Sequence, residues 1–180
     1  TATRLDPDNY DAAHGLGVVL RLAHREEEAE EQFRRALRLE PRSGAARAEA
    51  HAQIGSMLAL RGRLDEAAER FRQALALSPG AAELRFKLAS ALVLSGRPAE
   101  AAGELREAVR LKAGWAEGLN ALAWLLATTP DPSVRAPAEA LALAREASKL
   151  TGDEDPEILD TVAAAEAATG RFAQAAATAH

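Results

Sequence analysis

Residues 67–79 read AAERFRQALALSP, and this short stretch decides the fold because it recurs along the chain. Its pattern is Ala-x3-Phe-x2-Ala-Leu-x-Leu-x-Pro, and residues 29–41 repeat it in full. Residues 101–113 keep it with Leu105, Val109 and Ala113 in place of the phenylalanine, the first leucine and the proline, and residues 140–150 keep a looser form. Apolar residues spaced three and four apart share one face of a helix, so each copy predicts an amphipathic helix.

A second apolar helix pattern precedes each copy. It is centred on a large apolar residue followed by a glycine or alanine, at Leu16-Gly17, Ile54-Gly55, Leu88-Ala89, Leu122-Ala123 and, in a fifth unit, Val162-Ala163. The spacing from Ala67 to Ala101 is 34 residues, whereas it is 38 from Ala29 to Ala67 and 39 from Ala101 to Ala140. The additional residues are expected at 44–47 and at 129–135. A mid-helix glycine costs up to ~1 kcal/mol against alanine, so Gly17 and Gly55 predict close helix contacts.

A helix–turn–helix unit of about 34 residues with Leu-Gly, Ala-x3-Phe and Pro resembles the tetratricopeptide repeat. The resemblance covers nearly all of the chain. It implies an all-α fold, a right-handed α-α superhelix (solenoid) in which each hairpin stacks on the next. It also implies a concave inner surface lined mainly by the first helix of each pair.

Helix boundaries agree with this reading. Asn9, Ser43 and Asp155 are expected to cap helix N-termini, and Pro7, Pro41 and Pro79 follow helices that must end. Gly62, Gly96 and Gly170 are expected in the turns within hairpins, where a left-handed backbone is needed.

The spacing predicts one solenoid domain made of five repeats. Residues 1–9 are expected to be the tail of a preceding repeat, followed by repeats at 10–43, at 44–81 with an extended first helix, at 82–115, at 116–153 with a long turn between its helices, and, truncated, at 154–180. Terminal repeats of such arrays carry a polar cap, which neither end shows. The natural protein is therefore expected to continue past both ends.

The last two units show a narrower resemblance. Residues 119–128, 130–132, 150–152 and 159–161 are similar to the last repeats of many bacterial multi-repeat proteins. Several such proteins carry the array behind glycosyltransferase-like or other enzymatic segments. The resemblance implies a bacterial origin and leaves open a cytoplasmic or a periplasm-facing location.

Composition and missing motifs exclude several functions. The net charge is −5, from 22 basic and 27 acidic residues mixed along the chain, which argues against a nucleic-acid partner. No apolar run approaches the ~20 residues of a membrane span, so a soluble chain without membrane insertion is expected. There is no cysteine, no Gly-x-Ser-x-Gly and no phosphate-binding Gly-x4-Gly-Lys. The chain is therefore expected to be no enzyme and to bind no cofactor; a metal site from His14 and His51 is the less favoured alternative.

Two charged series accompany the repeats. Asp11, Glu49, Glu83 and Glu117 begin the first helices, where they could attract basic ligands or calcium, although the favoured interpretation is that they stabilise helix N-termini. Arg25, Arg63, Arg97 and Arg171 lie in the hairpin turns, where they could meet phosphate groups. We expect them instead to be solvated and to bond carbonyls at the end of the preceding helix.

Side chains one step away from the core face of the first helices are expected to line the concave groove. They are His14, Val18, Arg21, Gln53, Ser56, Phe86, Ser90, Asn120 and Trp124. Exposed aromatic residues are typical anchors for a partner peptide, which singles out Phe86 and Trp124. The alternative for Trp124 is packing into the neighbouring hairpin, and Trp115 is expected to be a packing residue.

These features favour a scaffold that binds an extended or helical segment of a partner protein in the groove. A different class of function is a non-catalytic arm of a larger bacterial enzyme, of glycosyltransferase type, that positions the substrate. A third is a homo-oligomer formed through the uncapped ends, where Phe172 would be exposed.

Overall fold

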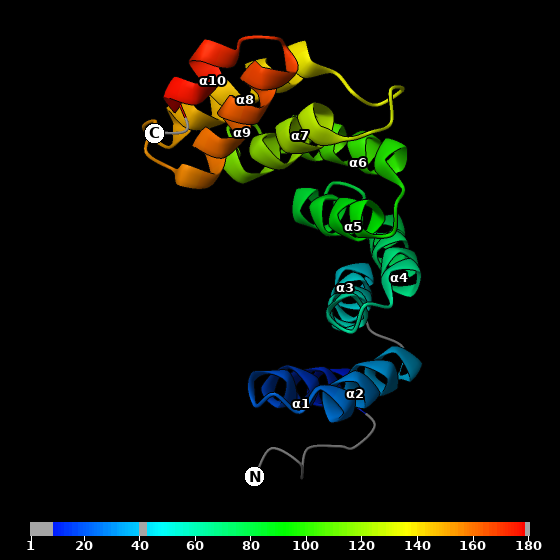
Figure 1. Cartoon of the computed structure of the whole chain (residues 1–180). Helices are drawn as coiled ribbons and strands as arrows, with labels where there is room; N and C mark the ends of the chain where they lie inside the picture. The colour runs from blue at the N-terminus through cyan, green and yellow to red at the C-terminus, as the bar shows by residue number, and fades with distance from the viewer. Residues whose placement is uncertain (1–8, 40–42, 179–180) are drawn as a thin grey trace. The chain divides into compact units, whose positions relative to one another are not determined.

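The computed structural model describes residues 9–39 and 43–178. Within them the chain forms ten helices and no strand: α1 (Tyr10–Leu22), α2 (Glu26–Arg38), α3 (Gly44–Leu60), α4 (Leu64–Leu77), α5 (Ala82–Leu94), α6 (Pro98–Leu111), α7 (Ala116–Thr128), α8 (Pro137–Leu150), α9 (Pro156–Ala168) and α10 (Phe172–Thr178) (Figure 1). The predicted all-α class is confirmed for this part of the chain. The expected tail at residues 1–8 and the helix stop at Pro41 lie outside it.

The chain divides into two compact units, residues 1–91 and residues 92–180, and the division falls within α5. In the first unit α1 packs against α2, α3 packs against α4, and α2 also contacts α3. In the second unit α7 contacts α6, α8 and α9, and α9 contacts α8 and α10. How the helices divide into repeats stays a prediction of the sequence spacing.

One helix and one connection are longer than their counterparts in the other hairpins. α3 has 17 residues, whereas α1 has 13. The α7–α8 connection spans residues 129–136, and the N–H of Ala136 donates to the carbonyl of Leu126 at 3.0 Å. This bond holds the end of the long connection against the last turn of α7.

The predicted N-caps are confirmed. Asn9 Oδ1 accepts from the N–H of Asp11 at 2.8 Å, and Ser43 Oγ accepts from the N–H of Ala46 at 3.1 Å. Asp155 accepts from two N–H groups in the first turn of α9. Each cap satisfies a backbone donor that has no partner within its own helix.

The predicted turn glycines adopt the left-handed backbone that their turns need. Gly62, Gly96 and Gly170 have φ of 73°, 74° and 79°. In the α1–α2 turn the same conformation falls on His24, with φ of 57°. The sequence offers no glycine in that turn, so reasoning from residue type missed this position.

Small residues let the paired helices approach closely, as predicted. A Cβ added at Gly17 would lie 2.9 Å from the ring of Phe33, and one added at Gly55 would lie 2.8 Å from the ring of Phe71. The two alanines that recur in the first three copies of the second-helix motif are fully buried, at Ala29, Ala36, Ala67, Ala74, Ala101 and Ala108. Side chains larger than alanine at these places would force the backbones apart.

Each unit also contains a buried carboxylate that joins successive hairpins. In the first unit Glu30 of α2 accepts from Arg34 on its own helix and from Arg61, which follows α3. In the second unit Glu166 of α9 accepts from Arg145 of α8 at 2.8 Å and from the hydroxyl of Thr178 at 3.0 Å. A buried carboxylate requires such partners, so these contacts fix the hairpins against each other.

Candidate functional site

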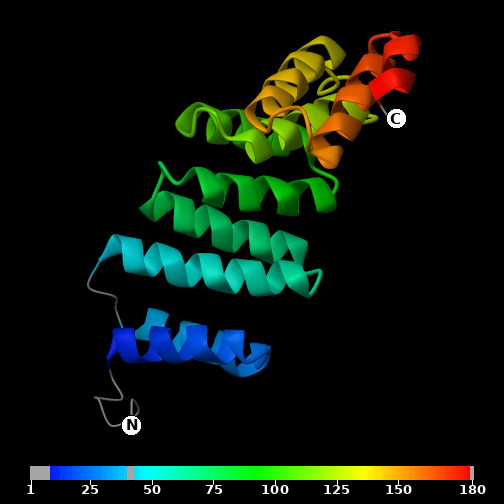
Figure 2. The same ribbon diagram turned by 90° about the vertical axis from the view of Figure 1, so that its left-hand side faces the viewer.

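The first helices of the first unit lie side by side. α1 (blue) and α3 (cyan) run in the same direction in Figure 2, and the Tyr10 hydroxyl at the start of α1 donates to the carbonyl of Ala46 at the start of α3. Lys87 of α5 donates to the Ser56 hydroxyl of α3 at 3.5 Å, which places α5 next to α3. The exposed and half-exposed side chains of α1, α3 and residues 82–91 are called the first-helix surface below.

The residues predicted to line the groove fall into two sets. The first-helix surface holds those of the first unit: His14, Val18, Arg21, Gln53, Ser56, Phe86 and Ser90. Asn120 and Trp124 lie on α7 in the second unit. Each set is considered within its own unit.

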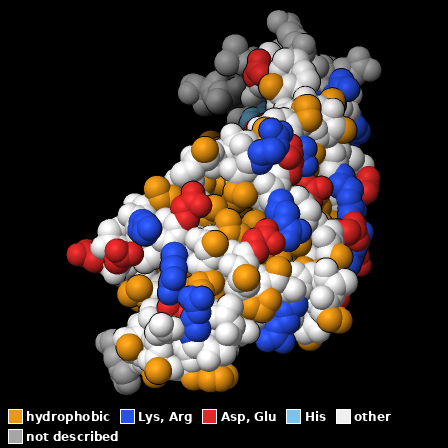
Figure 3. All heavy atoms as spheres, turned by 90° about the horizontal axis from the view of Figure 1, so that it is seen from above, with side chains coloured by type: hydrophobic (Ala, Val, Ile, Leu, Met, Phe, Trp, Pro, Cys, Tyr) orange, Lys and Arg blue, Asp and Glu red, His pale blue; other side chains and the backbone are white. Residues whose placement is uncertain are grey.

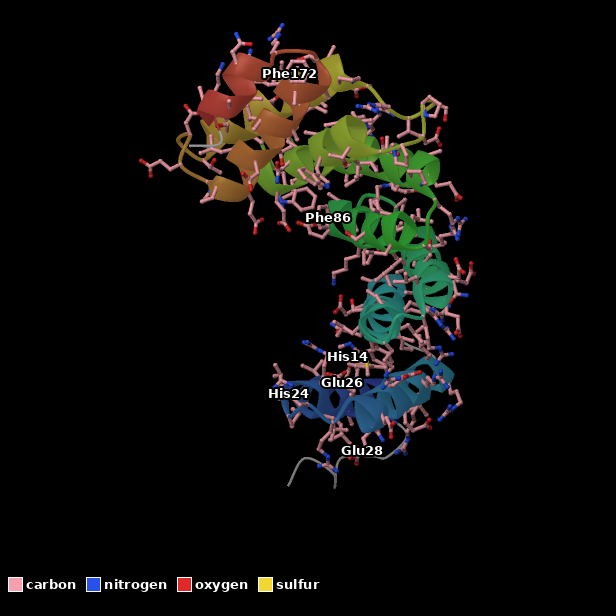
Figure 4. The ribbon with its side chains drawn as sticks, in the orientation of Figure 1. His14, His24, Glu26, Glu28, Phe86 and Phe172 are labelled. Atoms are coloured by element: carbon pink, nitrogen blue, oxygen red, sulfur yellow. The ribbon has the colours of Figure 1, made fainter. Side chains whose placement is uncertain are left out.

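His14 contributes to packing within its hairpin. Its ring stacks on Tyr10 at a centroid distance of 5.5 Å and meets the edge of the Phe33 ring at 5.4 Å. The Nε2 atom of His14 is buried and has no hydrogen-bond partner. The sequence predicts that His14 lines the groove, but its ring contacts Phe33 of α2 within the hairpin (His14 is labelled in Figure 4).

The middle of the first-helix surface is polar, and its groups bond locally. Gln53 donates to the carboxylate of Glu49 one turn earlier. The hydroxyls of Ser56 and Ser90 each donate to a carbonyl of their own helix at 3.0 Å. The polar groups of Gln53, Ser56 and Ser90 are thus bonded within their own helices.

Carboxylates gather at the edge formed by the starts of the helices. Burial, followed by the charges of Asp11 and Glu49, raises the pKa of Tyr10 to about 12. Asp11 belongs to α1 and Glu49 to α3, so side chains from two hairpins act on one hydroxyl. Glu83 is exposed at the corresponding place on α5.

The opposite edge, formed by the ends of the helices, is apolar. Leu22 and Leu60, the last residues of α1 and α3, are 68% and 82% exposed. Val19 is exposed one turn before Leu22. This edge was not predicted, although the sequence carries a signal for it: a leucine stands six positions after Leu16 and Ile54 of the Leu-Gly and Ile-Gly pairs, and Leu94 stands at the same offset after Leu88.

In the second unit Trp124 is half-exposed on α7, and the side-chain oxygen of Asn120 is buried without a hydrogen-bond partner. Trp115 has the packing role that was predicted. Its ring covers Gly118, where an added Cβ would lie 2.7 Å from it, and Lys112 Nζ lies 4.4 Å from the ring centroid.

The arginines of the hairpin turns differ from expectation. Three of them bond the glutamate three positions later through two nitrogens, in the pairs Arg25–Glu28, Arg63–Glu66 and Arg97–Glu100. These hydrogen bonds raise the pKa of Arg25 and Arg63. The sequence predicts that these arginine side chains bond carbonyls at the end of the preceding helix. Those carbonyls accept from backbone N–H groups instead: the carbonyl of Leu58, for example, accepts from the N–H of Arg63 at 2.9 Å.

Pairing of this kind neutralises much of the surface charge. Figure 3 shows basic side chains next to acidic ones over the face that it displays. In the described part of the chain no group of three or more His, Asp or Glu side chains is arranged to hold a metal ion. None of the helices described is long and apolar enough to span a membrane.

Two family models match the chain, and both describe the tetratricopeptide repeat. One matches residues 58–125, and the other matches residues 1–46 and 27–81. No curated protein sequence matches the chain.

Many solved structures share the fold. YrrB, described as a tetratricopeptide repeat protein with an unusual peptide-binding site, is 20% identical with a TM-score of 0.80, over 98% of this chain and 86% of YrrB. MamA from Desulfovibrio magneticus RS-1 is 16% identical with a TM-score of 0.82, over 97% of this chain and 92% of MamA. PilF from Pseudomonas aeruginosa is 21% identical with a TM-score of 0.77, over 98% of this chain and 76% of PilF.

These relatives share with the chain the all-α, solenoid-class fold that the repeat pattern predicted. Helical hairpins with a Gly–Phe contact, buried small residues and glycine turns are what the family's sequence motif encodes. The chain belongs to the tetratricopeptide repeat family.

Proposed function

We propose that this chain is a non-catalytic scaffold that binds a segment of a partner protein on its first-helix surface. Tetratricopeptide repeats serve in general as protein-interaction modules. Among the solved structures with this fold, YrrB is described as having a peptide-binding site. The binding residues in this chain are inferred from their own exposure and chemistry.

The exposed leucines carry the proposal. Leu22 and Leu60 are large apolar side chains that water surrounds on most sides, and the half-buried ring of Phe86 belongs to the same surface. Apolar groups that gather on one surface and are rimmed by polar groups mark interaction sites. Aromatic and large aliphatic side chains contribute most of the binding energy at such sites.

In the second unit Trp124 and Asn120 form a separate contact in this proposal. Trp124 supplies an exposed ring, and Asn120 lies one turn earlier on the same helix. The two sets are tested by separate variants because they belong to different units.

The test uses the purified chain as bait in a lysate of its source organism, with captured proteins identified by mass spectrometry. The first-unit variant is Phe86→Ala, and the second-unit variant is Trp124→Ala. Phe172→Ala is the matched control, because Phe172 (labelled in Figure 4) is a 70% exposed phenylalanine on α10 and belongs to neither set. Circular dichroism first establishes that each variant is folded.

We expect a partner that the parent and Phe172→Ala both retain and that Phe86→Ala loses. The partner, once purified, must then bind the parent directly and bind Phe86→Ala about tenfold more weakly, as loss of an aromatic anchor implies. Equal retention by the parent, Phe86→Ala and Phe172→Ala would show that the first-helix surface is not where the chain binds its partner.

A further inference from the structure

The two edges of the first-helix surface differ in chemistry, and this difference specifies the kind of segment that fits. The inference rests on the proposed function, because it describes the occupant of the same surface. α1 and α3 run in the same direction, so their starts form one edge and their ends form the other (Figure 2).

The edge at the helix starts carries the carboxylates of Asp11 and Glu49. Asp11 and Glu49 form no ion pair within the described residues, and the one side-chain donor to Glu49 is the neutral amide of Gln53. Glutamates elsewhere on the chain are paired with arginine, as Glu28 and Glu66 are. Helix N-termini stabilise carboxylates at this edge, but that effect leaves the negative charge available to a cation.

The two edges are separated by the length of the helix between them. Asp11 and Leu22 are 11 positions apart, and so are Glu49 and Leu60. At 1.5 Å per residue this corresponds to about 16 Å. An α-helix with its side chains is about 10–12 Å in diameter, so one helix lying across α1 and α3 fits within the strip, and side chains on its flanks can extend to the two edges.

We infer that the partner segment is a basic amphipathic helix that lies across α1 and α3. Lysine or arginine side chains on one flank extend to Asp11 and Glu49. Apolar side chains on the other flank contact Leu22 and Leu60. Between the two edges of α3 lie Gln53, which bonds Glu49, and the hydroxyl of Ser56, which accepts from Lys87 of α5. Docking of an amphipathic helix by its apolar face is a common mode of peptide recognition.

The probes are three synthetic peptides of about 18 residues, long enough to form a helix. The first carries leucines at helical spacing with lysines on one flank. The second replaces the lysines by glutamates, and the third replaces the leucines by serines. Binding to the whole chain is measured by fluorescence anisotropy. We expect the lysine–leucine peptide to bind at least about tenfold more tightly than either of the others, and less tightly as salt screens the charges.

Matched variants locate the peptide. Glu49→Gln is compared with Glu69→Gln, because each glutamate accepts a hydrogen bond from a glutamine four positions later, on α3 and on α4. We expect Glu49→Gln to weaken binding about two- to fivefold and to reduce its dependence on salt, as loss of one exposed charge pair implies. We expect Glu69→Gln to bind as the parent does.

The apolar edge has its own pair of variants. Leu60→Ser is compared with Leu150→Ser, since both leucines are exposed last residues of their helices, on α3 and on α8. We expect Leu60→Ser to weaken binding about five- to tenfold through lost apolar burial. Leu150→Ser should leave binding unchanged.

Two results would overturn the inference. If the glutamate-flanked peptide bound as tightly as the lysine-flanked one and Leu60→Ser weakened both, the charge assignment would be wrong while the proposed binding surface would stand. If no peptide bound, or if the control variants weakened binding equally, no basic helix would occupy this surface. The proposed function would then depend on the capture experiment with Phe86→Ala alone.

Discussion

Gly17 of α1 lies directly against the ring of Phe33 of α2: a Cβ at position 17 would be 2.9 Å from Cε1 of that ring. The Phe33 side chain is completely buried, so the ring cannot move aside into solvent. Gly55 and Phe71 repeat the contact at 2.8 Å in the next hairpin. The absence of a side chain at the glycine is thus what allows the two helices to close over the ring.

Gly17→Ala is therefore expected to destabilise the protein although alanine is the better helix former. Overpacking of a core costs about 1–3 kcal/mol, and the gain in helix propensity is ~1 kcal/mol, so a modest net loss results. Gly15→Ala, two positions away on the same helix, meets nothing within 4 Å and should stabilise the protein by about 0.5–1 kcal/mol. Urea unfolding of both variants measures the difference. Equal stabilisation by both would contradict the close contact.

Glu30→Ala is expected to lower the free energy of unfolding by about 1–3 kcal/mol, since it removes a buried acceptor shared by two arginines. The expected loss of stability is smaller than for a fully buried ion pair, because the side chains of Arg34 and Arg61 are partly exposed to solvent. The matched control is Glu31→Ala, which removes an exposed carboxylate paired with Arg38 on the same helix. It should leave the unfolding midpoint unchanged. A larger effect at position 31 than at position 30 would contradict the assigned burial.

Stability should fall as the pH drops from about 7.5 to about 5, in part because of His51. Burial, and then the charges of Arg70 and Arg47, lower the pKa of His51 from its usual 6.5. The unfolded chain therefore takes up a proton at a higher pH than the folded chain does. The contribution of His51 is full above pH 6.5 and is lost as the pH falls through that value toward the folded pKa.

His51→Gln serves as the comparison, because it removes the titrating group and keeps a polar side chain. Unfolding is followed by circular dichroism across the same pH range. We expect a smaller loss of stability between pH 7.5 and pH 5 in the variant than in the parent. Parallel pH profiles for the two proteins would show that the histidine does not titrate differently on folding.

Helix α10 is expected to exchange its amide hydrogens faster than the longer second helices. It has seven residues and buries none of them. Its Thr178 hydroxyl donates to the buried carboxylate of Glu166 at 3.0 Å, which ties its last turn to α9. Segments with few buried contacts open at low free-energy cost.

Thr178→Val tests this tether by hydrogen-exchange mass spectrometry. It removes the hydroxyl while leaving the bond from Arg145 to Glu166 in place. Exchange in α10 should accelerate, and exchange in α8 and α9 should not change. Slow exchange in α10 that the substitution fails to alter would mean that other contacts hold this helix.

The sequence could predict most of the fold because the relevant signals are local or periodic. Helix caps at Asn9, Ser43 and Asp155 depend on residues within one turn of the chain, and the structure has all three. The Gly–Phe contacts follow from paired positions 16 residues apart. The same spacing pairs Ala89 with Leu105. In this pair alanine stands where the other pairs have glycine, and the smaller leucine stands where they have phenylalanine.

The candidate site could be predicted only in outline. Periodicity indicated which helices would present a surface, and His14 and Phe86 were selected for their offset from the core face. It could not indicate that the His14 ring would turn toward Phe33, since that depends on a side chain of another helix. Nor did it identify Leu22 and Leu60, because a leucine at a helix end fits a buried position as well as an exposed one.

By itself the sequence determined the repeat, its helices, their caps and the small residues where helices meet, because each depends on spacing along one chain. Only the tertiary structure decided which charged groups meet a bonding partner and which apolar side chains are buried. Glu30 is buried and bonds Arg61, 31 positions away, whereas Asp11 and Glu49 form no ion pair within the described residues. Those outcomes depend on the neighbour that a side chain meets after folding, and the free energy of burial is set by that neighbour.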